Sequence, residues 1–199
     1  DAAARYRDAV VIGGGLLGLE AANGLARRGM QVTVVHLMPW LMERQLDETA
    51  ARLLQRSLAE RGIGFVTHAR TSALRAGDDG RVGAVQLDDG RTIAAQLVVV
   101  AAGIRPETTL AERAGLLCQR GVVVDDTLQT RTDPRIYAVG ECAAHRGVAY
   151  GLVAPLFEQA KVCANHLAGY GIGRYPGSEV STKLKVTGID LYSAGRFMG

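Results

Sequence analysis

A glycine-rich turn between an apolar strand and a helix constrains the fold of this chain more than any other feature. Residues 10–20 read VVIGGGLLGLE, so the strand runs directly into the pattern Gly13-x-Gly15-x-x-Gly18. In a dinucleotide-binding turn the first glycine allows a tight bend, the second lets the backbone approach the pyrophosphate, and the third lets helix and strand pack closely. The helix that follows points the positive end of its dipole at the phosphates.

The flanking sequence completes a β–α–β unit around this turn. Apolar residues recur at helical spacing after Gly18, Gly29 stands where the helix is expected to end, and residues 31–36 form a second strand. The alternative is a turn that merely tolerates glycine, but it does not account for the strand and helix on either side. We therefore expect a dinucleotide site here.

The next segments extend the same sheet. Asp47 is expected to cap a second helix, and residues 64–67 read as a short strand. The apolar residues of this helix recur at helical spacing: Ala50, Leu53, Leu54 and Leu58. The order strand–helix–strand–helix–strand is typical of a parallel sheet with right-handed crossovers.

Two copies of Asp-Asp-Gly-Arg, at 78–81 and 88–91, separate short β-prone runs such as residues 82–87. Asp-Gly between such runs favours hairpins, so a small antiparallel meander is expected. Residues 97–101 then predict a central strand of the parallel sheet, buried on both faces. It ends in the turn 102–106, where open α/β sheets bind their ligands.

The rest of the chain predicts a second, smaller arrangement. Residues 122–124 read as a short strand and residues 136–139 as a buried strand that stops at Gly140. A helix is expected over 154–167, and beyond it the chain is rich in glycine and then polar, with a strand predicted at 183–186.

Composition excludes several classes of protein. The net charge of +3 comes from scattered arginines without a basic stripe, which argues against a nucleic-acid partner. No apolar run is long enough to span a bilayer and no secretory signal opens the chain, so we expect no membrane and a cytoplasmic location. The three cysteines and four histidines have no metal-ligand spacing, and reduced thiols are expected.

The adenosine ribose is usually bound by an acidic residue at the end of the second strand. His36 occupies that position, and its imidazole is able to bond a ribose hydroxyl or, when protonated, to tolerate a 2′-phosphate. The nearest arginine downstream is Arg44. The choice between NADH and NADPH stays open with a lean toward NADH, and a surface histidine without a ligand is the alternative for His36.

Hydride-transfer chemistry needs an acceptor. Glu20 lies on the helix beyond Gly18, where a nicotinamide is able to reach it, with an exposed helix charge as the alternative. No tyrosine has a lysine four residues later, so the acid–base pair of a self-sufficient short-chain dehydrogenase is missing. A flavin would supply the acceptor.

Four stretches together resemble the two-dinucleotide-fold flavoprotein family of pyridine-nucleotide reductases. They are VVIGGGLLGLEAA, VTVV, VVVAAGIRPET and TRTDPRIYAVGEC, and the likeness spans roughly residues 9–168. Within that family, LLGLEAANGLARRGMQVTVVHLMPWLMERQLD and YGLVAPLFEQAK are most similar to the large subunits of assimilatory NAD(P)H nitrite reductases.

The resemblance implies roles for most of the candidate site residues. The NAD(P)H pyrophosphate would be held by Gly13, Gly15 and Gly18, with Leu16 and Leu17 as further cofactor-binding candidates. The nicotinamide would be faced by Glu20, Gly103 and Ile104. For FAD, Gly140 and Glu141 would meet the ribitol, where the family usually has aspartate, and the helix start at Ala154 and Pro155 would face the flavin ring.

The resemblance also implies an incomplete protein. The expected architecture is a Rossmann-like three-layer NAD(P)-binding domain with an antiparallel insertion, plus the second half of a FAD-binding domain. Residues 1–8 would be a tail, 9–121 the NAD(P)H domain, 122–168 the partial FAD domain, and 169–199 a linker and the start of an interface domain.

The implied function is electron input from NAD(P)H through FAD toward iron–sulfur and sirohaem centres that reduce nitrite to ammonia. Those centres, and much of the FAD site, would belong to missing parts of the parent protein, whose other domains are the expected partners, with a homodimer through the C-terminal domain as one arrangement. The alternatives are a NAD(P)H reductase for ferredoxin, rubredoxin or a nitrate reductase, and a non-catalytic NAD(H)-binding redox sensor.

Overall fold

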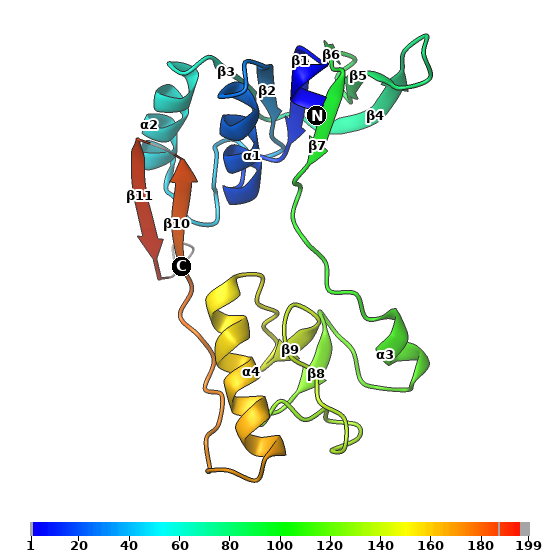
Figure 1. Ribbon diagram of the computed structural model, residues 1–199, viewed down its shortest axis with the longest axis vertical. Helices are drawn as coiled ribbons and strands as arrows, with labels where there is room; N and C mark the ends of the chain where they lie inside the picture. The colour runs from blue at the N-terminus through cyan, green and yellow to red at the C-terminus, as the bar shows by residue number, and fades with distance from the viewer. Residues whose placement is uncertain (1, 187, 196–199) are drawn as a thin grey trace. The chain divides into compact units, whose positions relative to one another are not determined.

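The computed structural model describes residues 2–186 and 188–195, which form two compact units. The first unit runs to Gly103 and resumes at Ser181, and the second spans Ile104–Val180 (Figure 1). This division differs from the expected boundary at 121–122, because residues before 122 bond within the second unit. Leu117 donates its amide to Thr132 Oγ1 at 2.8 Å and accepts from the Val123 amide at 2.9 Å.

The first unit is built on a four-stranded parallel sheet of order β3-β2-β1-β7. Its strands are β1 Asp8–Ile12, β2 Gln31–Val35, β3 Ile63–Val66 and β7 Leu97–Val100. Ahead of β1 the expected tail contains a 3-10 turn, Ala2–Ala4. The parallel order and the crossovers confirm the predicted α/β class.

Two helices cover one face of this sheet: α1, Leu16–Ala26, and α2, Glu48–Ala59. Asp47 caps α2 as predicted, since its side chain accepts from the Ala50 amide at 2.8 Å. The buried face of α2 carries Ala51, Leu54 and Leu58. Leu53, predicted to share that face, is 60% exposed because it lies one position around the helix from Leu54.

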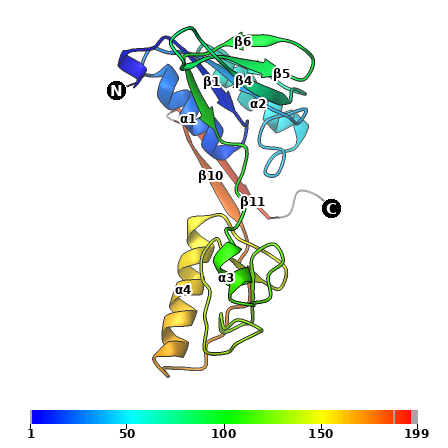
Figure 2. The same ribbon diagram turned by 90° about the vertical axis from the view of Figure 1, so that its right-hand side faces the viewer.

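An antiparallel meander covers the opposite face, so the unit has three layers. It consists of β4 Thr71–Ala76, β5 Val82–Leu87 and β6 Thr92–Ala94, in that order (Figure 2). Val85 and Leu87 pack on Val10 and Val35, which point away from the helices. The predicted meander is therefore confirmed.

The strand β7 corrects an expectation. It was predicted to be central and buried on both faces, but it lies at the edge of the described sheet with β1 as its partner. Its first three residues are half-buried and Val100 is 68% exposed. An apolar run alone does not distinguish an edge strand from a central one, since β-branched residues are enriched in both.

A C-terminal hairpin returns to the first unit. The strands β10, Ser181–Val186, and β11, Ile189–Ala194, pair antiparallel and confirm the strand predicted at 183–186. Leu184 and Val186 are buried in the same core as Leu19 and Leu54 of the two helices.

The second unit contains a two-stranded parallel sheet and two helices. These elements are α3 Thr109–Arg113, β8 Val122–Val124, β9 Ala143–His145 and α4 Val153–Leu167. The strand predicted at 136–139 is absent: Tyr137 makes one isolated bridge to Gln129, and Ile136 and Val139 are over a third exposed. This bridge consists of two backbone bonds, from the Thr130 amide to Ile136 and from the Ala138 amide to Leu128.

The described helices include none that is both long and apolar enough to cross a membrane.

Leu184→Ala is expected to destabilise the first unit by about 2–5 kcal/mol, because it removes a 1%-exposed side chain that the hairpin inserts into the helical core. Trp40 is the single tryptophan and lies in this unit, so its fluorescence during urea unfolding reports the change selectively. Tyr192→Ala is the matched control on the same hairpin, since Tyr192 is 67% exposed. Equal midpoints for the two variants would contradict the packing role of the hairpin.

Candidate functional site

At two positions of the glycine-rich turn, the neighbouring backbone lies too close to leave room for a side chain. Gly13 has φ of 120°, and a Cβ built on it would lie 2.3 Å from the carbonyl oxygen of Ala101. A Cβ on Gly18 would lie 1.9 Å from the carbonyl oxygen of Gly13. The first and third glycines of the motif therefore let β1, α1 and the end of β7 approach one another.

Gly15 has the opposite surroundings, since a Cβ there would meet no atom within 4 Å. Gly15 is also the N-cap of α1, and no side chain caps the first amides of this helix. Leu16 and Leu17 begin the helix, and Leu17 is 65% exposed. The open space beside uncapped amides fits the pyrophosphate of a dinucleotide.

His36 lies beneath this turn and is only 7% exposed. Its Nδ1 accepts from the Gly14 amide at 3.0 Å, so the ring proton must be on Nε2. Nε2 in turn donates to the Trp40 carbonyl oxygen at 3.0 Å and to Glu43 Oε2 at 3.2 Å. Both ring nitrogens of the residue predicted to bind ribose are thus engaged within the chain.

The segment after β2 is fastened to the turn by its backbone as well. The Met42 amide donates to the Gly14 carbonyl oxygen at 3.0 Å, and the side chains of Leu41 and Met42 are fully buried. Glu43, which follows them, was not anticipated from the sequence. The sequence feature that points to Glu43 is the apolar pair Leu41–Met42, because burial of these two side chains fixes the next residue beside His36. Arg44 is exposed.

A cavity of about 510 Å³ opens at the carboxyl ends of β2 and β3. It is lined by Pro39, Trp40, Arg52, Gln55, Arg56, Ala59, Thr67 and His68. Half of this lining belongs to α2, and neither the glycine-rich turn nor His36 contributes to it, so the hollow does not include the predicted nucleotide-binding residues. The Pro39–Trp40 break in the sequence marks its position.

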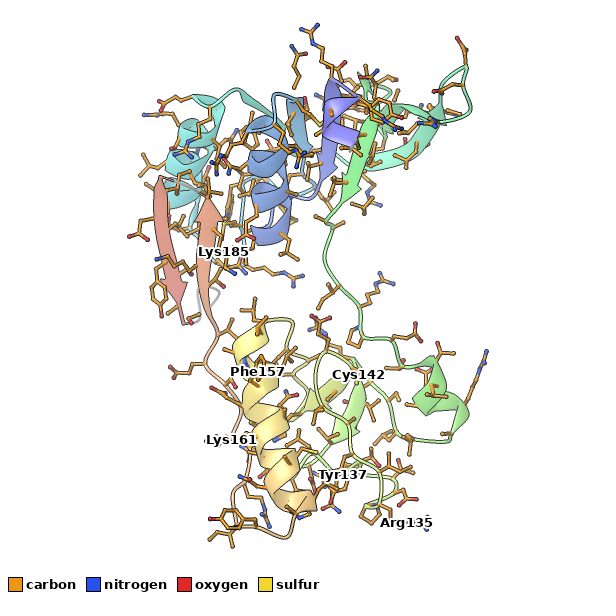
Figure 3. All side chains as sticks on the ribbon, in the orientation of Figure 1. Arg135, Tyr137, Cys142, Phe157, Lys161 and Lys185 are labelled. Carbon is orange, nitrogen blue, oxygen red and sulfur yellow. The ribbon has the colours of Figure 1, made fainter. Side chains whose placement is uncertain are left out.

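Glu20 is tied to the C-terminal hairpin. Its Oε1 accepts from the backbone amide of Lys185 at 2.9 Å, and Lys185 is labelled on β10 in Figure 3. Of the other two residues predicted at the nicotinamide, Gly103 follows β7 with φ of 98°. Ile104 begins the second unit, where its side chain lies over Gly151.

The residues predicted to bind FAD all lie in the second unit. Gly140 has φ of 91° and donates its amide to Gln159 Oε1 of α4 at 3.0 Å. Glu141, beside the Cys142 labelled in Figure 3, is exposed. No side chain caps α4, and Ala154 in its first turn is exposed while Pro155 is buried. A free carboxylate and uncapped helix amides fit the ribitol and ring of a flavin.

A charged cluster stabilises the second unit. Asp126 accepts from Arg146 at 2.7 Å and from the buried His145 at 2.8 Å. These bonds lower the pKa of Asp126 from 3.8 to about 2, with the Arg146 hydrogen bond as the largest cause. His145 also packs on the ring of Tyr175, which is 1% exposed.

Similarity to known proteins identifies the family of this chain. The family model of the pyridine nucleotide-disulphide oxidoreductases matches residues 2–166, most of the chain. The chain belongs to this family. A family member of known structure, a FAD-dependent pyridine nucleotide-disulphide oxidoreductase from Desulfovibrio vulgaris, superimposes with a TM-score of 0.87 at 32% identity, over 96% of this chain and 49% of that one.

Two relatives from Bacillus subtilis are more similar in sequence. A nitrite reductase [NAD(P)H] is 56% identical over 98% of this oxidoreductase chain, which spans 24% of that protein. An assimilatory nitrate reductase electron transfer subunit is 46% identical over 98% of the chain, which spans 25% of it. The chain therefore covers about a quarter of the length of these relatives.

Within the described part of the oxidoreductase chain, no group of three or more histidine, cysteine or acidic residues is placed to hold a metal ion.

Gly15→Ala is expected to weaken NADH binding at least about tenfold without destabilising the fold, because its Cβ enters empty space where the pyrophosphate approaches. Gly24→Ala is the matched control: it also meets no neighbour, lies inside α1, and is expected to stabilise the helix by about 1 kcal/mol with unchanged affinity. Calorimetric titration with NADH and thermal unfolding followed by Trp40 fluorescence measure both quantities. Equal affinities would place the pyrophosphate elsewhere.

Asp126→Asn is expected to destabilise the second unit near neutral pH and to lose this effect in acid. The pKa of Asp126 is about 2 in the folded chain against 3.8 when free, so its stabilising contribution is present above pH 3.8 and disappears as the pH falls toward 2. Near-UV circular dichroism of the buried tyrosines Tyr150 and Tyr175 follows this unit. The exposed Glu179→Gln is the control, and a difference from wild type that is undiminished at pH 2 would refute the assignment.

Proposed function

We propose that this chain is the electron-input segment of a longer NAD(P)H nitrite reductase. The observation that carries the proposal is the cradle at Gly13, Gly15 and Gly18, with two positions closed to any side chain and one open, in a chain 56% identical to a nitrite reductase. When bound, NAD(P)H supplies a hydride and FAD passes its electrons on singly. Iron–sulfur and sirohaem centres elsewhere in the longer protein would then reduce nitrite to ammonia.

In that scheme the residues of this chain bind NAD(P)H and FAD and orient them. The amides at the start of α1 and the open face of Gly15 hold the pyrophosphate. Glu20 and Gly103 of the first unit are proposed to position the nicotinamide, and Ile104, the first residue of the second unit, remains a predicted contact.

At the flavin end, Glu141 accepts from a ribitol hydroxyl beside Gly140, and the start of α4 at Ala154 and Pro155 stabilises negative charge on the reduced ring.

A second candidate is electron transfer to a nitrate reductase. The 46% identity to the nitrate reductase electron transfer subunit favours it, since the electron-input chemistry would be the same. The two candidates differ in the terminal acceptor, which this chain does not contain.

Partners and location follow from the same proposal. The partners of this chain are NAD(P)H and the remaining domains of the longer protein, with a homodimer through a further C-terminal domain as a prediction. Cys118, Cys142 and Cys163 are free thiols, which is in keeping with the reducing cytoplasm.

The decisive experiment uses the full-length protein with its flavin. Anaerobic mixing with NADH is expected to bleach the flavin absorbance within the turnover time, and adding nitrite is expected to restore it with formation of ammonia. Recovery with nitrate but not nitrite would favour the second candidate. An intact flavin that NADH does not bleach would overturn both and leave a nucleotide sensor.

A further inference from the structure

We propose that Glu43 binds the adenosine ribose and makes this site selective for NADH, with His36 as the residue that positions it. This inference rests on the proposed function, because it concerns the same NAD(P)H site. It assigns the ribose contact to a residue seven positions beyond the usual one.

The first step is the direction of the hydrogen bonds around His36. The Gly14 amide is a donor, so Nδ1 of His36 accepts and the proton lies on Nε2. That N–H reaches Glu43 Oε2 at 3.2 Å, sharing its proton with the Trp40 carbonyl oxygen. The imidazole therefore has no acceptor or donor left for a ribose hydroxyl, and with the ring edge that faces away from Gly14 it holds a carboxylate instead.

The second step is that Glu43 is held in place yet accessible. Its backbone follows Leu41 and Met42, whose side chains are fully buried, and the Met42 amide bonds to Gly14. The Glu43 side chain retains 21% exposure, against 8% for that of His36. Among the described residues, its second oxygen, Oε1, has no hydrogen-bond partner.

The third step is chemical. A carboxylate oxygen accepts strongly from a ribose hydroxyl, which is why an acidic residue normally ends the second strand of such folds. Here the imidazole of His36 occupies that position, and its hydrogen bond to Glu43 lets the Glu43 carboxylate make the ribose contact in its place. A carboxylate at this place repels the 2′-phosphate of NADPH, and the ribose hydroxyls of NADH satisfy its free oxygen.

Glu43→Gln in this chain is the direct test, because an amide loses the charge while keeping the shape. NADH affinity measured by calorimetry is expected to fall about tenfold, the scale of a hydrogen bond to a charged group, and the preference for NADH over NADPH to shrink by at least as much. Glu48→Gln is the matched control, since Glu48 is an exposed carboxylate paired with Arg52 on α2. It is expected to change neither value.

A 2′-deoxy analogue of NADH separates direct contact from a general structural effect. Wild type is expected to bind the analogue about tenfold more weakly than NADH, and Glu43→Gln to bind the two alike. Equal losses for both nucleotides in Glu43→Gln would overturn the proposal, as would a wild-type preference for NADPH, which would point to Arg44. Wild type that binds no pyridine nucleotide at all would instead refute the proposed function.

The positioning role of His36 has its own readout. Glutamine places an amide donor where Nε2 of the imidazole lies and is able to donate to Glu43, whereas leucine has no donor. His36→Gln is expected to keep most of the discrimination between NADH and its 2′-deoxy analogue, and His36→Leu to lose it. Identical discrimination in both variants, with Trp40 fluorescence reporting intact folding, would show that His36 does not position Glu43.

Discussion

The close approach of three backbone segments at the glycine-rich turn is the constraint on which the rest of the first unit depends. The end of β7 touches Gly13, and the carbonyl of Gly13 touches Gly18 of α1, at distances that exclude a methyl group. This contact sets the position of the helix axis over β1, and with it the direction of the uncapped helix amides. The proposed pyrophosphate site is thus a consequence of packing rather than of any side chain.

The segment between β2 and α2 is in turn held in place by the glycine-rich turn. Gly14 uses both of its backbone groups to bind this segment, its amide to His36 and its carbonyl to Met42. Leu41 and Met42 are buried in the core of this unit, and Glu43 is bonded to His36. The loop that follows the strand end is therefore fastened to the turn at two points, which suits the proposed selection between two cofactors that differ by one phosphate.

The two units are stabilised by different means. The first has a large apolar core between sheet and helices, completed by a hairpin from the far end of the chain. The second has a smaller core around Leu128, Tyr150 and Tyr175, and supplements it with the ion cluster of Asp126, His145 and Arg146. Acid is therefore expected to affect the second unit first, since among the described residues a carboxylate with a strongly lowered pKa faces a buried histidine only there.

The sequence by itself determined the parallel sheet, the meander and the nucleotide turn, because each depends on local chemistry: glycine where no side chain fits, Asp-Gly at the hairpins, apolar spacing along the helices. Tertiary structure alone decided that β7 is an edge strand and that residues 136–139 do not form a strand. It likewise decided that the hairpin bonds to Glu20, 165 residues earlier in the sequence. It also decided that His36 is engaged by Gly14 and Glu43. These outcomes depend on which distant backbone groups find one another, and local residue patterns carry no record of such partners.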